Sequence, residues 1–460
     1  MAGRTSDDDV IAYTGFHPPS PKTSATAWSP ARIDPATITP DDFFTRYIAT
    51  RTPVILSPFA ETLRAKWTKA YLARTAGSLP VIVEQRDAAT GGFGSGKTRI
   101  NTTFAEFLAS VDEGGTYMTT QYGSEEDDGV DSLCVSENDG GDDPVDLAAY
   151  RPNPLRPLLP DIAKHIGLRP ALLGPLVPQT MNLWLGSTRA PTSSGLHHDF
   201  QDNLYVLLRG EKTFTVFSPK DADKMYTHGG VRRVGENGYV HYIPGVRDDG
   251  ANRHAVAAWK VRVARRELAA AEAAGTNVGA ARETLAELTD EDEDDDGGDF
   301  PGFGALRDDY EDDSDVDADP RTNRKRPVSP SSASGPPSGF KKLKPSTTAP
   351  PPSFSRIPVT ILHAASPSST FPLLADATKT TFTLRAGDAL YLPTGWFHEV
   401  ASANAKDAEL ESAEGAFHMA LNYWLAPPTG VTVEEAYEDA YAEDYWQRVE
   451  AAVEREMEQA

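Results

Sequence analysis

The sequence predicts a mainly β protein, an antiparallel barrel or sandwich with flanking helices and one long inserted segment. The first observation is a set of short runs rich in Val, Leu, Phe, Tyr and Thr, namely NLYVLLRG, KTFTVFS, TFTLRAGDALYLP and HMALNYWLA. The second is that Gly, Pro and Asp separate these runs at the spacing of short antiparallel strands. The third is a change of composition over residues 245–352, where few side chains could bury apolar surface.

The part of the chain before these runs is mixed in character. Amphipathic periodicity predicts helices in PDDFFTRYIA and NTTFAEFLASV, and apolar runs predict strands in PVILS and LPVIVEQ. We expect residues 1–35 to form a tail and residues 36–244 and 353–428 to form the folded domain.

The end of the chain, residues 429–460, is predicted to form a final helix. Aromatic and branched residues recur there every four positions and mark one face: Tyr437, Tyr441, Tyr445, Val449 and Val453. We expect this face to pack on the protein core, and the alternative is the interface of a homodimer.

Residues 245–352 are predicted to be an insertion. The segment begins with the alanine-rich helical stretch AVAAWKVRVARRELAAAEAA, is interrupted at Gly275, and continues with the shorter helical stretch AARETLAEL. From Asp290 to Asp319 there are sixteen acidic residues and one arginine, a net charge of −15 out of −24 for the chain. We expect most of this segment after its helical start to be disordered.

Two basic stretches follow the acidic run, RKRP at 324–327 and KKLK at 341–344. Their pairing predicts a two-part signal for a nuclear import receptor. The alternative is a solvated basic stretch that balances the neighbouring acids, in which case we expect the protein in the cytoplasm.

Charge and composition exclude several classes of function. A net charge of −24 argues against direct nucleic-acid binding, because phosphate backbones attract basic surfaces. No apolar run approaches the roughly 20 residues that span a bilayer, so no membrane association is expected. The single cysteine, Cys134, cannot form an internal disulfide or a cysteine zinc cluster, which fits a reducing compartment.

The stretch GGFGSGKT at 91–98 matches the pattern of a phosphate-binding loop. Such a loop must leave a buried strand directly and open a helix at its Lys and Thr. Here QRDAAT separates the strand from the glycines, and the next helix is predicted to be capped later, within 101–103. We therefore interpret it as a surface hairpin or loop.

The stretch SGLHHDF at 194–200 carries the strongest metal-binding pattern. In an extended strand, residues i and i+2 share a face, so His197 and Asp199 project together while His198 points the other way. His398, in GDALYLPTGWFHEV, is the best third ligand. Two histidines and a carboxylate leave coordination positions open for a cosubstrate and oxygen, as in non-haem Fe(II) oxygenases.

The spacing of these residues supports the insertion. His197 and His398 are 201 positions apart, but only 93 without the 108 residues of 245–352, a distance that a compact barrel can close. Lys212 shares its strand face with Phe214 and Val216 and is therefore expected to enter an apolar interior. A buried ammonium is costly without a partner, so something anionic should meet it.

Together these residues resemble the JmjC family, in its cupin-like small-hydroxylase branch, which includes the asparaginyl hydroxylase that inhibits the hypoxia-inducible factor. The resemblance rests on NLWLG, SSGLHHDFQDNLYVLLRGEKTFTVFSP, FSRI, GDALYLPTGWFHEV and ALNYWLAPP, and it covers residues 36–244 and 353–428. It implies a double-stranded β-helix (a jelly-roll, cupin-like fold), with Fe(II) as metal and 2-oxoglutarate as cosubstrate. It also implies a protein or peptide substrate that is hydroxylated or demethylated.

The resemblance also implies roles for individual residues. His197, Asp199 and His398 would bind the iron, and Lys212 would pair with the distal carboxylate of 2-oxoglutarate. Four further residues would lie at the cosubstrate: Ser194, Asn203, Tyr117 and Asn422. The sequence departs from its relatives in two ways, because serine replaces threonine at 194 and small relatives lack the insertion.

Three alternatives stay open at this point. A non-catalytic cupin-like scaffold could recruit partners through the acidic insertion, but it would have no need of both the triad and Lys212. Another metal in the same site could serve an isomerase or a binding protein. Within the oxygenases, a lysine demethylase would use the same core; no zinc-finger or histone-reading module is visible, and this favours hydroxylation.

Overall fold

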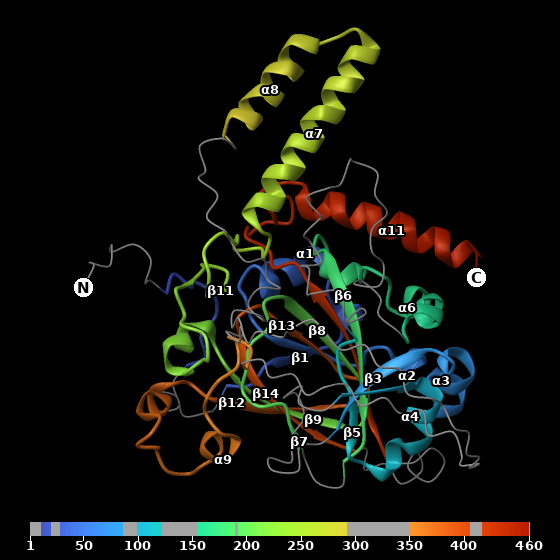
Figure 1. The fold of residues 1–460 in the computed structure, drawn as a ribbon. Coiled ribbons are helices and arrows are strands. Elements are labelled where there is room, and N and C mark those ends of the chain that lie inside the picture. The colour runs from blue at the N-terminus through green and yellow to red at the C-terminus, as the bar shows by residue number, and fades with distance from the viewer. Residues whose placement is uncertain are drawn as a thin grey trace, which may run out of the picture.

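The computed structural model describes residues 11–19, 28–85, 99–121, 154–188, 192–291, 350–404 and 416–459. Within these residues the architecture is two β-sheets with helices around them (Figure 1). None of the described helices is long and apolar enough to cross a lipid bilayer. The acidic run beyond Glu291, Cys134 and both basic stretches lie outside the described residues, so the predictions of disorder and nuclear import stay predictions.

The larger sheet has nine strands among the described residues, in the order β1-β2-β13-β8-β15-β6-β5-β3-β4. Its neighbouring strands are antiparallel except β1 and β2. Its bounds are β1 Ala31–Ile33, β2 Val54–Leu56, β3 Pro80–Gln85, β4 Arg99–Thr103, β5 Thr116–Met118, β6 Pro178–Gly186, β8 Asp202–Arg209, β13 Ala389–Leu392 and β15 His418–Leu425.

The smaller sheet contains four described strands in the order β12-β9-β14-β7. Its bounds are β7 Thr192–Ser193, β9 Glu211–Phe217, β12 Thr380–Arg385 and β14 Phe397–Ala403. A separate two-stranded ribbon pairs β10 Arg233–Val234 with β11 Val240–His241. The strands predicted from NLYVLLRG, KTFTVFS, TFTLRAGDALYLP and HMALNYWLA all form.

The two sheets face each other, because side chains of both contribute to one buried cluster. Tyr205 and Leu207 on β8 pack there with Phe214 and Val216 on β9. The intervening residues of β8, such as Val206, point to the opposite side and join a second core under the helices. This alternation of period two gives the sandwich that the sequence predicted.

Helices cover the outer face of the larger sheet and extend from the fold at one end (Figure 1). The α-helices are α1 Pro40–Phe43, α2 Glu61–Lys66, α3 Lys69–Ala76, α4 Phe104–Ser110, α6 Leu159–His165, α7 Arg253–Ala274, α8 Val278–Glu291, α9 Val359–Leu362 and α11 Tyr441–Gln459. Helix α1 continues as a π-helix over Phe44–Ile48, and short 3-10 helices cover Pro35–Thr37, Val111–Glu113, Arg156–Leu158, Ala171–Leu173, Pro219–Lys224 and Pro372–Asp376.

The stretch NTTFAEFLASV divides between two elements. Its first residues complete β4, and α4 begins at Phe104 with Thr103 as its N-cap. Thr103 and Glu106 form a reciprocal capping box, in which each side chain accepts a hydrogen bond from the other residue's backbone. The predicted cap position is therefore confirmed.

Strand β3 pairs with β4 as an antiparallel hairpin, so the glycine-rich stretch 91–98 connects two strands. Those residues themselves lie outside the described range. A phosphate-binding loop would lead into a helix, whereas the chain here resumes as strand β4 at Arg99. The prediction of a hairpin is thus confirmed by the elements on either side.

Helix α11 packs on the core of its own chain. Tyr441, Tyr445, Val449 and Val453 are each at most 5% exposed and belong to the core cluster beneath the larger sheet. Tyr437 precedes the helix and donates a hydrogen bond from its hydroxyl to the carbonyl of Ala426 (2.8 Å). The stripe is core packing, and a homodimer through the C-terminal helix stays a prediction.

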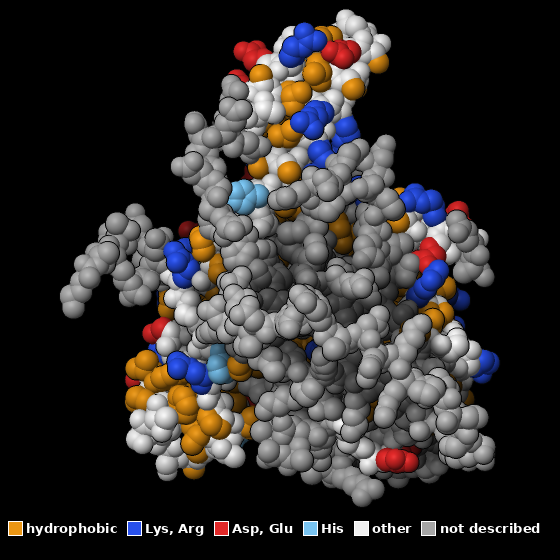
Figure 2. Space-filling model, viewed as in Figure 1, with side chains coloured by type: hydrophobic (Ala, Val, Ile, Leu, Met, Phe, Trp, Pro, Cys, Tyr) orange, Lys and Arg blue, Asp and Glu red, His pale blue; other side chains and the backbone are white. Residues whose placement is uncertain are grey.

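The helical start of the insertion forms α7 and α8, which project together from the fold (Figure 1). Gly275 ends α7 in the left-handed conformation (φ 68°), as its place in the sequence predicted. On the face seen in Figure 2, apolar side chains of this pair are scattered among Lys, Arg and acidic residues, as on a solvent-exposed helix.

The root of α7, in contrast, belongs to the folded domain. Val256 and Trp259 are buried in the main core, and the Trp259 ring meets that of Tyr441 edge-on at 5.6 Å. Arg247 forms ion pairs with Asp249 and Asp439. The segment that packs independently of the β-sheets therefore begins after Ala264, the last residue of α7 that is buried, and not at residue 245.

The N-terminal segment is also part of the packed structure where it is described. Tyr13 is 3% exposed, and residues 11–14 hydrogen-bond to the backbone around β10. The Phe16 and Trp28 rings pack against Trp396, which follows β13. The predicted tail of 1–35 thus contains residues that cover one end of the sandwich.

Candidate metal centre

The three predicted ligands meet at one point between the sheets. His197 and Asp199 lie in the segment that joins β7 to β8, and His398 lies on β14. One ligand atom from each lies within 4.8 Å of the other two, and His398 Nε2 is 3.8 Å from Asp199 Oδ2. Among the described residues this is the one such group of His, Cys, Asp and Glu.

Backbone pairing fixes the relative position of the two histidines. The amide of His197 donates to the carbonyl of His398 (3.0 Å), and the amide of His398 donates back to His197 (2.6 Å). The imidazole of His197 also stacks on the Phe354 ring, with centroids 4.8 Å apart and planes 12° apart. Residues 201 positions apart thus become direct neighbours.

Each histidine presents the same nitrogen to the centre. The Nδ1 atom of His197 lies 3.0 Å from the Gly195 carbonyl, and Nδ1 of His398 lies 2.9 Å from the Trp396 carbonyl. A carbonyl only accepts, so Nδ1 carries the proton and Nε2 keeps a free lone pair. Burial, and then the neighbouring His398, lower the pKa of His197 to about 4, so it is neutral at pH 7 and able to bind a metal.

Asp199 is oriented by two donors. Its Oδ2 atom accepts hydrogen bonds from Asn203 Nδ2 (3.1 Å) and Trp424 Nε1 (3.2 Å). Asn203 in turn accepts from Asn422 Nδ2 (3.2 Å), whose oxygen accepts from Trp184 Nε1 (2.9 Å). The predicted amides, Asn203 and Asn422, therefore reach the centre as supports of the carboxylate. Neither tryptophan was predicted.

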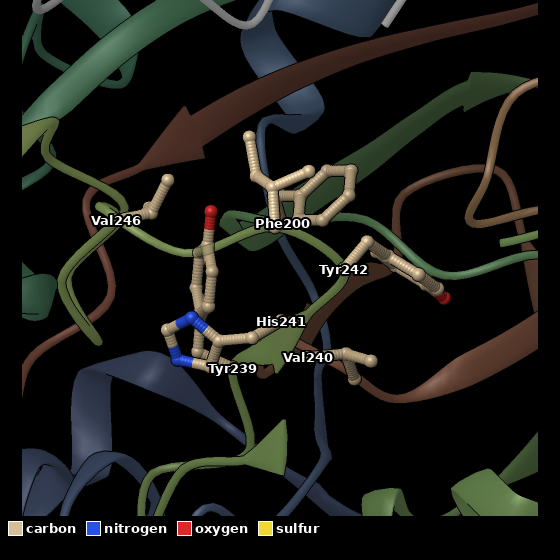
Figure 3. Close-up of a pocket in the computed structure, with 7 residues that line it drawn as sticks. Phe200, Tyr239, Val240, His241, Tyr242 and Val246 are labelled. Atoms are coloured by element: carbon tan, nitrogen blue, oxygen red, sulfur yellow. The ribbon is translucent and has the colours of Figure 1, made fainter. Parts of the chain in front are cut away.

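His198 points away from the centre, as strand parity predicted. Its Nε2 atom is 2.8 Å from the Tyr242 hydroxyl, and its ring stacks on that of Tyr242 at 5.7 Å. Figure 3 shows a small pocket whose lining includes Phe200, Tyr239, Tyr242 and Val246. None of the three triad residues is among those that line this pocket.

Lys212 is buried in the same interior, 1% exposed, as its strand parity predicted. Its Nζ atom donates to Ser402 Oγ (2.6 Å), lies 3.4 Å from His418 Nδ1, and is 5.6 Å from the centre of the Tyr117 ring. No carboxylate among the described residues pairs with it, and burial lowers its pKa to about 7. The pocket is therefore suited to an anion that comes from outside the chain.

The Ser194 hydroxyl is hydrogen-bonded to backbone groups. It donates to the Gly195 carbonyl (3.0 Å) and accepts from the Val400 amide (3.1 Å). It therefore joins the segment after β7 to β14. The hydroxyl beside Lys212 belongs to Ser402, and a contact of Ser194 with the cosubstrate stays a prediction. Ser402 lies four positions after His398 on β14, and His418 lies four positions before Asn422 on β15. Residues an even number of positions apart on a strand share a face, so strand parity could have predicted that Ser402 and His418 enter the same interior.

A buried ion pair joins the two segments that carry the ligands. Asp202, 0% exposed, pairs with Arg51 and accepts from the Tyr391 hydroxyl (2.5 Å) and the Thr394 amide (2.9 Å). The Thr394 hydroxyl donates to the Phe200 carbonyl (2.8 Å), and the Gly395 amide donates to that of Asp199 (3.1 Å). The turn before His398 is thus tied to the backbone of Asp199.

Comparison with known proteins agrees with this geometry. The family model for the cupin-like domain matches residues 40–429. JmjC domain-containing protein 4 of Schizosaccharomyces pombe is 30% identical over 454 residues, which cover 89% of this chain and 87% of the relative. The chain belongs to the cupin-like family of JmjC proteins. The expected double-stranded β-helix is therefore confirmed as the fold class.

Two further relatives match this cupin-like protein over short stretches. The human bifunctional peptidase and (3S)-lysyl hydroxylase JMJD7 is 41% identical over 70 residues, 15% of this chain and 21% of the relative. The lysine-specific demethylase JMJ32 of Arabidopsis thaliana is 39% identical over 49 residues, 11% of this chain and 14% of the relative. The family thus includes relatives named for each of the two reactions.

The opposite orientations of the neighbouring histidines can be tested by metal binding. His197→Ala should weaken Fe(II) or Co(II) binding by more than the roughly 10- to 100-fold that follows loss of an outer hydrogen-bond partner. His198→Ala should keep an affinity near that of the wild type, because its ring faces Tyr242. Isothermal titration calorimetry measures both constants, and equal losses in the two variants would contradict the assigned geometry.

The hydrogen bond between Thr394 and the segment that carries His197 and Asp199 can also be tested by metal binding. Thr394→Val keeps the side-chain shape but removes the hydrogen bond to Phe200, so we expect metal affinity to fall by about 10-fold. The matched control is Thr215→Val, a buried threonine on β9 whose hydroxyl meets Thr381 (3.4 Å). If both variants lose stability by similar amounts and neither changes metal affinity, Thr394 does not position the ligands.

Proposed function

We propose that this cupin-like protein is an Fe(II)- and 2-oxoglutarate-dependent oxygenase that hydroxylates a side chain of another protein. The observation that carries the proposal is the buried Lys212 ammonium, which has no carboxylate partner among the described residues and shares an interior with the metal triad. A scaffold that needed only the shape of the fold would gain nothing from either group.

The residues present fit both groups. His197, Asp199 and His398 offer two imidazole nitrogens and a carboxylate oxygen, the donor set that non-haem Fe(II) takes. Lys212 would hold the distal carboxylate of 2-oxoglutarate, with the Ser402 hydroxyl positioning its ammonium. Bound iron and cosubstrate would supply the activation of molecular oxygen. The chain orients Asp199 through Asn203 and Trp424.

Hydroxylation is proposed ahead of demethylation on two grounds. The chain shows no histone-reading or zinc-finger motif in its sequence. The stretch that matches the human protein named as a lysyl hydroxylase is also longer, 70 residues against 49 for the plant protein named as a demethylase. Demethylation of methyl-lysine is the second candidate, because it would use the same ligands and the same lysine.

Turnover and product mass test the proposal. The purified protein with Fe(II) should convert 2-oxoglutarate to succinate slowly, and faster with a substrate peptide. Candidate peptides should gain one oxygen in mass spectrometry; loss of a methyl group would instead support demethylation. Lys212→Met should abolish turnover at low cosubstrate concentration, whereas Lys220→Met, which changes an exposed lysine, should not. Iron binding without succinate from any peptide would favour the scaffold.

The buried lysine also predicts a pH dependence of cosubstrate binding. In the free protein the pKa of Lys212 is about 7, and a bound carboxylate favours the ammonium and raises that pKa. Above pH 7 binding must therefore take up a proton, and affinity for 2-oxoglutarate should fall by up to about tenfold per pH unit. Calorimetry of the Zn(II)-loaded protein from pH 6 to 9, in buffers of different ionisation enthalpy, measures affinity and proton uptake.

The lowered pKa of Lys212 also affects the stability of the free protein. Stability should rise with pH, whereas affinity for 2-oxoglutarate should fall. Because the pKa of Lys212 is lowered by folding, the unfolded chain binds more protons between about pH 7 and 10.5, and this lysine's contribution makes stability rise over that window.

Affinity for 2-oxoglutarate that stays constant from pH 6 to 9, without proton uptake, would show that Lys212 is charged before the cosubstrate binds.

A further inference from the structure

One buried amide in the interior has no partner. Asn182 lies on β6 and is 1% exposed, and within the described part of the chain neither its Nδ2 nor its Oδ1 atom has a hydrogen-bond partner. Its neighbours in the interior are satisfied, because Asn422 and Asn203 bond to each other and to Trp184 and Asp199. Buried polar groups are rarely left unpaired, so Asn182 requires an explanation.

The Asn182 side chain faces the interior that holds the metal centre. Met181, Leu183 and Leu185 on the same strand pack into the outer core under the helices, so Asn182 and Trp184 point the opposite way. Asn182 is also the direct cross-strand partner of Asn422 on β15. Three amides on three adjacent strands, Asn203, Asn422 and Asn182, therefore extend from Asp199 across the larger sheet.

The side chains of two tryptophans lie over the Asn182 amide. Trp184 follows Asn182 by two residues, and Trp424 follows Asn422 by two on the antiparallel strand, where it pairs with Thr180. Their positions are thus four residues apart along the strands, about 13 Å. Their ring centroids are nevertheless only 6.3 Å apart, so the two indoles converge above the Asn182–Asn422 pair.

The chemistry of the amide limits what it binds. Both its donor and its acceptor are unpaired, so a complementary group must accept one hydrogen bond and donate another. The 2-oxoglutarate dianion has only acceptors and would leave Oδ1 unpaired. A peptide group or a side-chain carboxamide satisfies both atoms, and flat indole faces suit the same planar group.

We propose that Asn182 is a substrate-binding residue, which takes a peptide or carboxamide group of the protein substrate beneath Trp184 and Trp424. The inference rests on the proposed function in naming a protein as the ligand. Trp184 and Trp424 are both partly exposed, so they form the side from which a ligand reaches Asn182. Trp184 is held in place by its hydrogen bond to Asn422 (2.9 Å).

The first test is stability of the metal-free full chain. Asn182→Leu removes an unpaired amide at similar volume, so its thermal midpoint should equal or exceed that of the wild type. The matched variant Asn422→Leu removes an amide bonded to Trp184 and Asn203, and its midpoint should be lower. If Asn182→Leu lowers the midpoint as much as Asn422→Leu does, the amide is structural and the proposal is wrong.

The second test uses small probes and nuclear magnetic resonance of the ¹⁵N-labelled full chain. The side-chain signals of Asn182 are identified by their loss in Asn182→Leu. N-methylacetamide, which donates and accepts, should shift them saturably, and N,N-dimethylacetamide and acetate, which only accept, should shift them less than half as far. An equal shift with acetate would make this an anion site. No shift with any probe would mean an ordered water only. Either result overturns the proposal.

Neither test uses iron or turnover. A protein that binds N-methylacetamide at Asn182 but forms no succinate would contradict the proposed oxygenase and leave the amide site standing. A protein that forms succinate but shows no shift of the Asn182 signals would support the proposed oxygenase and contradict the amide site.

Discussion

The structure depends on one buried carboxylate, that of Asp202 at the start of β8. Burying an ion pair costs desolvation of both charges, which is recovered only when the remaining lone pairs find donors. Asp202 meets this condition through Arg51, the Tyr391 hydroxyl and the Thr394 amide. These partners come from the N-terminal region and from β13 with the turn that follows it, so Asp202 on β8 joins three distant parts of the chain beside the candidate metal centre. The backbone of Arg51 is in the left-handed conformation (φ 55°).

The interior between the sheets is divided into two environments. One part is apolar and fills the space between Leu207, Phe214 and Leu384. The other is polar, and it contains the triad, the amides and Lys212. Because the apolar part excludes water, the polar groups act at low dielectric, where a fixed hydrogen bond or charge has a larger effect. The lowered pKa of Lys212 is a direct result of this burial.

The inserted segment, which begins with α7 and α8, joins the β-sandwich at its margins. The root of α7 packs through Trp259 on Tyr441 of α11, while the ends of α7 and α8 extend away from the sheets. The described chain resumes at residue 350, and Phe354 stacks directly on His197. The insertion therefore leaves the domain beside α11 and re-enters it at the metal centre. Loop closure entropy grows slowly with length, so the core tolerates such a segment.

The sequence by itself determined the strand pattern and the candidate metal ligands. Alternation of period two placed Lys212 in the interior, and the same parity directed His197 and Asp199 to one face and His198 to the other. Only the tertiary structure decided which side chains surround them. Arg51 and the two tryptophans reach the site through strand order, register and turn geometry, which set neighbours across hundreds of positions and leave no local pattern in the sequence.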